Sequence, residues 1–223
     1  MHELQALHMA KVFLCEIEQF HREIALAGVV LAGGWSSRLG QDKLALKMRG
    51  ADAPDLLAQS VALLSRHCGH TLVACRQGQD FPEYSCVYDA HHGLGPIAGL
   101  QAAMLATTLP LLAIACDLPF MDDATIQSLI AAHASRPENT IMTTFRQAET
   151  GFIEALTAIY EPDCLALFTQ AIGAGRRQIR LAVPPDRRHD IVYARSAARP
   201  FFNLNRPEDL EQARALMRSP AGR

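Results

Sequence analysis

The sequence lacks the features that mark exported, membrane-spanning and nucleic-acid-binding proteins. No apolar run approaches the length needed to cross a bilayer, and the first twenty residues have neither a basic start nor an unbroken apolar middle. None of the six cysteines forms a C-x-x-C pair, and most lie inside apolar runs, which favours a reducing compartment. With 21 Lys and Arg against 23 Asp and Glu, no basic excess attracts DNA, RNA or a membrane surface. We therefore expect a cytoplasmic protein without nucleic-acid or membrane partners.

The sequence also lacks a Pro/Ser-rich linker or a shift in composition that would divide its 223 residues. We expect one α/β domain over residues 24–218, a short tail at 219–223 and an extension at 1–23. Apolar residues recur every three or four positions over residues 3–22, which predicts an amphipathic helix. This helix either packs on its own domain or docks a partner protein, and an unstructured start is the third interpretation.

The most informative stretch is VVLAGGWSSRLGQDK, at residues 29–43. Residues 24–32 are apolar and rich in Val, Leu and Ile, which predicts a strand buried on both faces of a parallel sheet. Gly33 and Gly34 follow, and without a Cβ they let the main chain bend sharply and bring N–H groups close to an anion. Hydroxyl donors and two positive charges are then added by Ser36, Ser37, Arg38 and Lys43. Together these features predict a site for the polyphosphate of a nucleotide.

Two common glycine loops do not match this stretch. A Walker A loop has Lys directly after its last glycine, whereas Gly40 is followed by Gln41 and Asp42 before Lys43. The dinucleotide fingerprint needs glycines spaced G-x-G-x-x-G, and the glycines at 28–40 do not have that spacing. A plain glycine turn among solvated charges is the alternative interpretation.

Strands and helices alternate along most of the chain. The patterns predict strands at 24–32, 70–75, 86–88, 111–115, 140–144 and 156–160, and helices at 54–68, 100–107, 122–134, 164–172 and 205–217. Asn205 and Glu208 have the spacing of a capping box for the last of these helices. Because such an order favours right-handed crossovers, we expect a single Rossmann-like α/β domain with a mainly parallel sheet and helices on both faces.

Several candidate site residues follow predicted strands, and ligands bind at the carboxyl ends of strands in sheets of this kind. Gly33 and Gly34 follow the first strand, Asp89 the third and Asp117 the fourth. A carboxylate facing a phosphate loop repels the phosphates unless a cation lies between them, and Mg²⁺ prefers such oxygen ligands. We therefore expect Asp117 to hold Mg²⁺, with a helix cap or a turn former as its structural alternative.

A set of short motifs occurs in a fixed order: LAGG at 31–34, RLG at 38–40 with Lys43, GPIAG at 95–99, CDLP at 116–119, GRR at 175–177 and FNLNRPEDL at 202–210. In order and spacing they resemble the molybdenum cofactor guanylyltransferases, which are nucleotidyltransferases of the GT-A-like fold. The resemblance covers about residues 25–217, and the motifs are specific when taken together. It implies transfer of GMP from GTP to the terminal phosphate of Mo-molybdopterin, with release of pyrophosphate.

The same resemblance implies roles for individual residues. Because two anions meet in this reaction, charge neutralisation and in-line alignment are its main catalytic needs. Lys43 would hold phosphate, Asp117 would hold Mg²⁺ against the triphosphate, and Arg38 would neutralise the departing pyrophosphate. The guanine, ribose and nucleoside would be met by Leu31, Ala32, Gly33, Gly34 and Asp89. The pterin, or the second half of the site, would be met by Arg176, Arg177, Asn203 and Asn205.

Departures from the family pattern leave alternatives open. Cys75 stands where relatives often have an Asn that helps to read the base, so a cytidylyltransferase acting on the same pterin, or an enzyme acting on a sugar or polyol phosphate, stays open. The double glycine and Asp42 before Lys43 favour the guanylyl members. Glu154 is a further candidate contact, although Ala155 follows it instead of the usual proline.

A non-catalytic nucleotide-binding module is the alternative from a different class. The joint presence of Lys43 and Asp117 argues against it, because a binding module has less need of a carboxylate that holds a metal. For the enzyme, the expected partners are its small-molecule substrates. A protein partner is a further expectation: a molybdoenzyme, its chaperone or another cofactor-biosynthesis protein.

Overall fold

The apolar run before the glycine loop forms the central strand β1 (Ala27–Leu31), in which every residue is buried. On its two sides β1 pairs in parallel with β2 (His70–Cys75) and β4 (Leu111–Ala115), and β3 (Ser85–Tyr88) pairs in parallel with β2. The structure is a computed structural model that describes residues 26–33, 43–48, 50–91 and 93–218. The predicted extension at 1–23, the tail at 219–223 and most of the glycine loop lie outside the described residues.

The remaining strands extend the sheet beyond β4. There β6 (Ile153–Tyr160) runs antiparallel to both β4 and β5 (Met142–Gln147), and β7 (Arg188–Tyr193) runs parallel to β5. The described residues thus form a seven-stranded sheet in the order β3-β2-β1-β4-β6-β5-β7. The reversed strand arises because a short turn, rather than a crossover helix, joins β5 to β6. The predicted single α/β domain with a mainly parallel sheet is confirmed.

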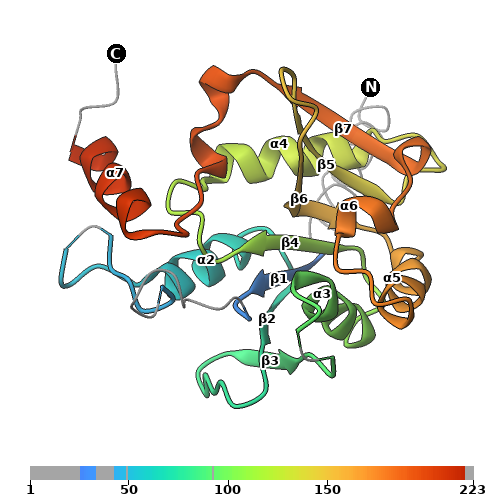
Figure 1. Cartoon of the computed structure of the whole chain (residues 1–223), viewed down its shortest axis with the longest axis horizontal. Helices are drawn as coiled ribbons and strands as arrows, with labels where there is room; N and C mark the ends of the chain where they lie inside the picture. Colours follow the sequence, from blue (N-terminus) through green and yellow to red (C-terminus); the bar gives the residue numbers. More distant parts are fainter. Residues whose placement is uncertain (1–25, 34–42, 49, 92, 219–223) are drawn as a thin grey trace, which may run out of the picture.

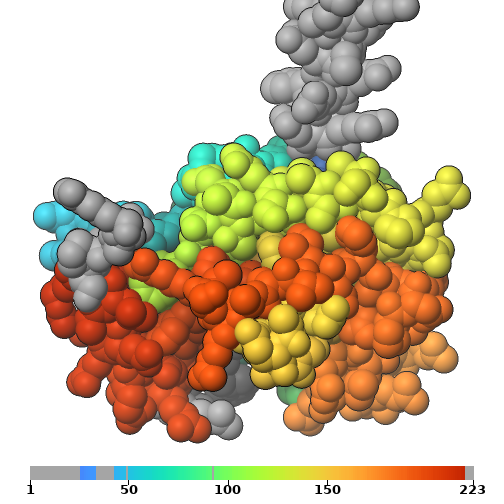
Figure 2. All heavy atoms as spheres, turned by 90° about the horizontal axis from the view of Figure 1, so that it is seen from above, coloured from blue at the N-terminus to red at the C-terminus, as the bar shows by residue number. Residues whose placement is uncertain are grey.

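Helices cover both faces of the sheet (Figure 1). On one face pack α2 (Leu56–Leu64) and α4 (Asp123–Ala134), and on the other pack α3 (Pro96–Leu105), α5 (Cys164–Gly173) and α6 (Ile179–Ala182). Much of the surface seen in Figure 2 is formed by α4 and by the chain that follows β7. The last helix, α7 (Pro207–Arg218), lies at one end of the molecule, near the loop that leads into α2. Among the helices described, none has the length and apolar character that a bilayer crossing requires.

Local sequence signals explain where the helices begin. The Asp55 carboxylate accepts the Ala58 N–H at 2.8 Å at the start of α2. At the start of α4, the Asp122 carboxylate accepts the Thr125 N–H at 2.9 Å. Pro96 occupies the first turn of α3, where its missing N–H costs nothing. α3 and α4 begin within eight residues of the strands before them, whereas a longer stretch of chain separates α2 from β1.

Several predicted elements are wrong in detail. The acidic cap of α7 is Asp209 and not Glu208, since the Asp209 carboxylate accepts the N–H groups of Asn205 at 2.9 Å and Arg206 at 2.8 Å. The sequence does not predict strand β7, because three of its six residues are polar and none is buried at this edge of the sheet. Pairing also lengthens β5 to Gln147 and begins β6 at Ile153, beyond the apolar runs that predicted them.

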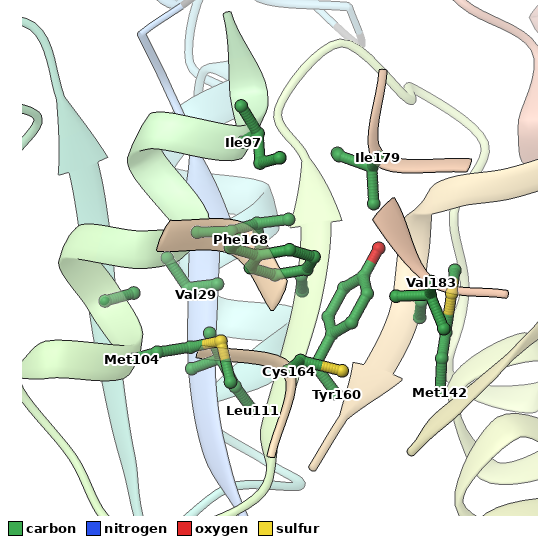
Figure 3. Packing of buried hydrophobic residues seen from close by; sticks show 14 of the residues in the cluster. Val29, Ile97, Met104, Leu111, Met142, Tyr160, Cys164, Phe168, Ile179 and Val183 are labelled. Atoms are coloured by element: carbon green, nitrogen blue, oxygen red, sulfur yellow. The ribbon is translucent and has the colours of Figure 1, made fainter. Parts of the chain in front are cut away.

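The core lies in two layers, one on each face of the sheet. Alternate strand residues face opposite sides, so Val29 joins the cluster beneath α3 and α5, whereas Val30 joins the cluster beneath α2 and α4. In the first layer the ring of Phe168 meets the ring of Tyr160 edge to face, with the centroids 5.4 Å apart (Figure 3). Burial on both faces explains why the central strands are continuous apolar runs.

We expect Phe168→Ala to lower the free energy of unfolding by about 3–5 kcal/mol, because the fully buried ring would leave a cavity against Tyr160. The matched control is Leu105→Ala on α3, whose side chain is 69% exposed and whose loss should change stability by no more than about 0.5 kcal/mol. Urea unfolding monitored by circular dichroism measures both variants. Equal effects of the two substitutions would contradict this description of the core.

Candidate active site

The carboxyl ends of the central strands are level, since Leu31 pairs with a residue near the end of each neighbouring strand. Backbone pairing continues past the strands: the Ala32 N–H donates to a β2 carbonyl at 3.0 Å, and the Asp89 N–H donates to the last carbonyl of β2 at 3.2 Å. Gly33, Asp89 and Asp117 therefore leave the sheet along one edge.

The residue that ends the glycine loop lies against the strand-end carboxylate. Lys43 Nζ is 2.7 Å from Asp117 Oδ2, and the two side chains are only 10% and 11% exposed. The sequence predicts that phosphate and Mg²⁺ lie between Lys43 and Asp117. In the structure the two side chains are in direct contact. Removing either charge from water is costly, and in this contact the two opposite charges compensate each other.

The second oxygen of this carboxylate has a different environment. Within the part of the chain that the structure describes, Asp117 Oδ1 is buried and accepts no hydrogen bond. A buried carboxylate oxygen without a donor is unfavourable, and a cation or an N–H or O–H group would remove the cost. This orphaned oxygen fits the predicted metal ligand better than it fits a helix cap, whose oxygen would accept a backbone N–H.

The FNLN segment is fixed beside Asp117 by the main chain. The Leu204 N–H donates to the carbonyl of Asp117 at 3.0 Å, and the Leu204 side chain is fully buried. The exposed residues Asn203 and Asn205 flank this anchor. The Asn203 amide donates to the Phe201 carbonyl at 3.2 Å, which orients it. One backbone contact thus brings two candidate residues 86 or more positions away in sequence to the end of β4.

A cavity of about 230 Å³ opens on the side of Asp117 that faces β6 and α6. Its walls are residues 152–157 and 177–180, together with Pro96, Ala115, Leu118 and Asn203. Arg177 and Asn203, which the sequence assigned to the second half of the site, therefore meet in one cavity. Gln178 and Arg180 also line it and were not predicted; the spacing of Arg177 and Arg180 by three residues was the available signal.

Arg176 does not line this cavity. It is exposed, and its N–H donates to the Ala171 carbonyl at 2.8 Å, which ends α5. The backbone of Arg176 therefore stabilises the turn that follows α5. Of the two basic residues in the GRR motif, Arg177 alone lines the cavity.

Glu154 is the acidic side chain of the cavity wall. It accepts a hydrogen bond from the Tyr193 hydroxyl at 2.5 Å, which joins β6 to the end of β7. Burial raises the pKa of Glu154, and the Tyr193 hydrogen bond opposes that rise. Sequence reasoning missed Tyr193 because it lies on the unpredicted strand. Glu154 thus presents an oriented, partly desolvated carboxyl group to the cavity.

Cys75 points into the core and away from the strand-end edge. It is buried in the cluster beneath α2 and α4, and its Sγ is 3.4 Å from the Cys86 Sγ on β3. Burial raises the pKa of the Cys75 thiol, with the Cys86 contact adding to the effect. Its side chain therefore offers no polar contact to a base at this edge.

The residues just before the glycine pair have only backbone N–H and C=O groups with which to contact a ligand. The side chains of Leu31 and Ala32 are buried, so only their backbone groups are directed along the strand end. Gly33 is half-buried, and Asp89 is half-buried at the end of β3. The predicted site residues Gly34 and Arg38 lie outside the described residues.

Comparison with known proteins identifies the family to which this chain belongs. The family described as the MobA-like NTP transferase domain matches residues 28–217. The chain belongs to that family. Over 202 residues it is 30% identical to a probable molybdenum cofactor guanylyltransferase of Chloroflexus aggregans, a match that covers 86% of this chain and 95% of the relative. It is 32% identical over 188 residues to the molybdenum cofactor guanylyltransferase of Xanthomonas euvesicatoria, covering 81% and 90%.

A solved structure supports the fold of this MobA-like transferase. Molybdopterin-guanine dinucleotide biosynthesis protein A from Archaeoglobus fulgidus superposes with a TM-score of 0.68 at 22% identity, covering 86% of this chain and 98% of that one. The predicted family and the predicted nucleotidyltransferase class are confirmed.

We expect the Lys43–Asp117 pair to show strong coupling in a double-mutant cycle. Lys43→Met and Asp117→Asn should each destabilise by about 3–5 kcal/mol, because each leaves a buried polar or charged group unpaired. The double variant should cost at least about 2 kcal/mol less than the sum of the two. Urea denaturation supplies the four free energies.

The matched control is the half-exposed pair Arg146–Asp190, with 3.0 Å between Nε and Oδ2, for which Arg146→Met and Asp190→Asn should couple by no more than about 1 kcal/mol. Additive effects at Lys43 and Asp117 would show that the two side chains do not interact in solution.

Proposed function

We propose that this chain transfers GMP from GTP to a phosphate of Mo-molybdopterin and releases pyrophosphate. The relatives named as molybdenum cofactor guanylyltransferases, matched over nearly their whole length, support the reaction. The observation that carries it for this chain is the contact between Lys43 and Asp117, which puts a phosphate-binding cation and a metal-binding carboxylate at one point of the strand-end edge.

The nucleotide is proposed to bind across the ends of β1, β2 and β3. Backbone groups of residues 31–33 and the carboxylate of Asp89 would meet the guanine and ribose. This placement is supported by the level strand ends and by the Asp89 N–H held on β2. Gly34 and Arg38 are proposed to complete the phosphate side of the loop.

Asp117 is the proposed ligand for Mg²⁺, through the orphaned Oδ1. When bound, the ion would neutralise charge on the triphosphate, as divalent ions do in phosphoryl transfer. Among the residues that the structure describes, no group of three His, Cys, Asp or Glu side chains is gathered to hold a metal alone. A site of one carboxylate with substrate phosphates is the arrangement that Mg²⁺ commonly adopts.

Lys43 would change partners in the reaction. Without substrate it donates to Asp117 and compensates that carboxylate. A phosphate oxygen is a stronger competitor for the ammonium group once another cation compensates Asp117. Lys43 would then hold the transferred or departing phosphate, and the ion pair seen here is a resting arrangement that keeps both groups in place.

The acceptor is proposed to bind in the 230 Å³ cavity. Arg177 would receive its phosphate, Asn203 and Glu154 would contact the polar pterin edge, and Arg176 and Asn205 would lie at the periphery. Support comes from the mixture of cationic, amide and carboxyl groups with apolar walls, which is typical of a small-molecule site. The cavity shares Ala115 and Leu118 with the turn that carries Asp117, so acceptor and nucleotide would meet there.

The cellular setting is part of the proposal. In the described part of the chain, Cys68, Cys75, Cys86 and Cys164 form no disulfide, which supports residence in a reducing cytoplasm. Transfer of the finished cofactor to a molybdoenzyme or its chaperone would supply a protein partner.

We expect Asp117→Asn to abolish pyrophosphate release with GTP, Mg²⁺ and Mo-molybdopterin, and Lys43→Ala to lower kcat by about 10²–10³-fold, because each removes charge compensation from the transition state. Asp163→Asn is the control, since its exposed carboxylate lies at the start of α5 and should leave turnover unchanged. A coupled phosphate assay measures release. Wild-type rates in either site variant would contradict the assignment.

The same assay decides between related activities. Faster release with CTP than with GTP would assign the chain to cytidylyl transfer. Binding of nucleotides without release in the presence of the pterin would favour a non-catalytic module.

A further inference from the structure

A second, larger hollow of about 730 Å³ lies on the other side of the Asp117 turn. Its walls come from four separate parts of the chain: residues 47, 48, 50 and 51, then Phe120, then Arg199, and the last half of α7. In Figure 1, α7 and the loop that leads into α2 lie at the same end of the molecule. The hollow shares no lining residue with the 230 Å³ cavity.

The charged residues that line this hollow are all positive. Lys47, Arg199, Arg214 and Arg218 line it, and among the described residues no Asp or Glu does. Within the described residues, none of these four side chains forms an ion pair, although seven other ion pairs are present there. The floor is apolar and consists largely of Met48, Phe120 and Met217. Four cations are thus gathered without compensation in a chain whose net charge is −2.

Ordinary structural roles account for only part of this arrangement. Arg218 lies in the last turn of α7, where a cation interacts favourably with the helix dipole. Arg199 lies over the Phe120 ring, 4.8 Å from its centroid, and Lys47 donates to the Ala51 carbonyl at 2.7 Å. Neither contact removes a positive charge, and the ammonium of Lys47 keeps two further donors. These contacts therefore do not explain why three of these segments bring their cations to one hollow.

We propose that this hollow binds an anion that carries two or more linked phosphate groups. Arginine forks match phosphate oxygens in geometry, and three of the four cations are arginines. The volume lies within the range of small-ligand sites, and the methionine and phenylalanine floor accommodates an organic group attached to the phosphates. Such an anion is either free pyrophosphate or the polyphosphate of a nucleotide.

The hollow is connected to the candidate active site through two short stretches of chain. Lys47 follows Lys43 by four residues, and Phe120 follows Asp117 by three. Arg199 belongs to the segment that ends at Leu204, whose N–H is bonded to the Asp117 carbonyl. A bound anion therefore contacts the same three segments that position the Lys43–Asp117 pair. Anion binding in the hollow does not depend on the proposed guanylyl transfer, so an experiment can contradict one proposal and leave the other standing.

The methionine methyl groups report on this site directly. The chain has seven methionines, of which Met48 and Met217 line the hollow. In the full chain labelled with ¹³C at the methionine methyls, and with these two signals assigned by Met48→Leu and Met217→Leu, pyrophosphate should shift both signals in a saturable way. Met104 and Met142 belong to the cluster beneath α3 and α5 and should not shift.

Substitution of the arginines tests whether their charges bind the pyrophosphate. Arg214→Gln with Arg218→Gln should weaken pyrophosphate binding at these methyls about tenfold or more, since two charge-assisted contacts are lost. Glutamine keeps the helix propensity of arginine, so α7 should persist. The matched control, Arg187→Gln with Arg195→Gln, removes the same charge outside the hollow and should leave the Kd within about twofold.

The outcomes separate the possible ligands. Shifts with pyrophosphate and GTP alike assign the hollow to a polyphosphate group, and shifts with GTP alone assign it to a nucleotide. If neither ligand shifts Met48 and Met217, or if the Arg214→Gln, Arg218→Gln variant binds as tightly as the control, the proposal is wrong.

Discussion

A buried ion pair between Lys43 and Asp117 joins the end of the glycine loop to the end of β4. Both side chains are about nine-tenths buried, so little water reaches either charge and the two opposite charges compensate each other. The remaining oxygen of Asp117 is orphaned among the described residues. The pair therefore both stabilises the strand-end turn and leaves one ligand position open at it.

The sheet explains why the candidate site residues converge at this point. Parallel register makes β1, β2 and β4 end level, and the reversed strand β6 then brings Glu154 and its neighbours to the same region from the other half of the fold. The turn after β4 consequently separates two hollows: Ala115 and Leu118 line the smaller one, and Phe120 lines the larger, cationic one. A single short turn thus lines both of these hollows.

The parallel half of the fold was predictable from the sequence because its strands are buried on both faces. LLAIA is wholly apolar and HTLVAC is apolar after its first two residues, and both strands have the bounds that the sequence predicts. Strand β7 has no such signal in its sequence, since it is extended because it pairs with β5 at the edge of the sheet. For the site, strand ends and motifs indicated Lys43, Asp117, Arg177 and Asn203. Tyr193 and the cationic hollow depend on contacts between distant segments, which periodicity does not encode.

A crystal structure of the chain with Mg²⁺ and a non-hydrolysable GTP analogue tests the central claim most directly. The exchange of partners at Asp117 predicts that Lys43 Nζ leaves the carboxylate for a phosphate oxygen, while Asp117 becomes a ligand of the metal ion. A nucleotide bound elsewhere, with the Lys43–Asp117 contact still at 2.7 Å, would contradict it.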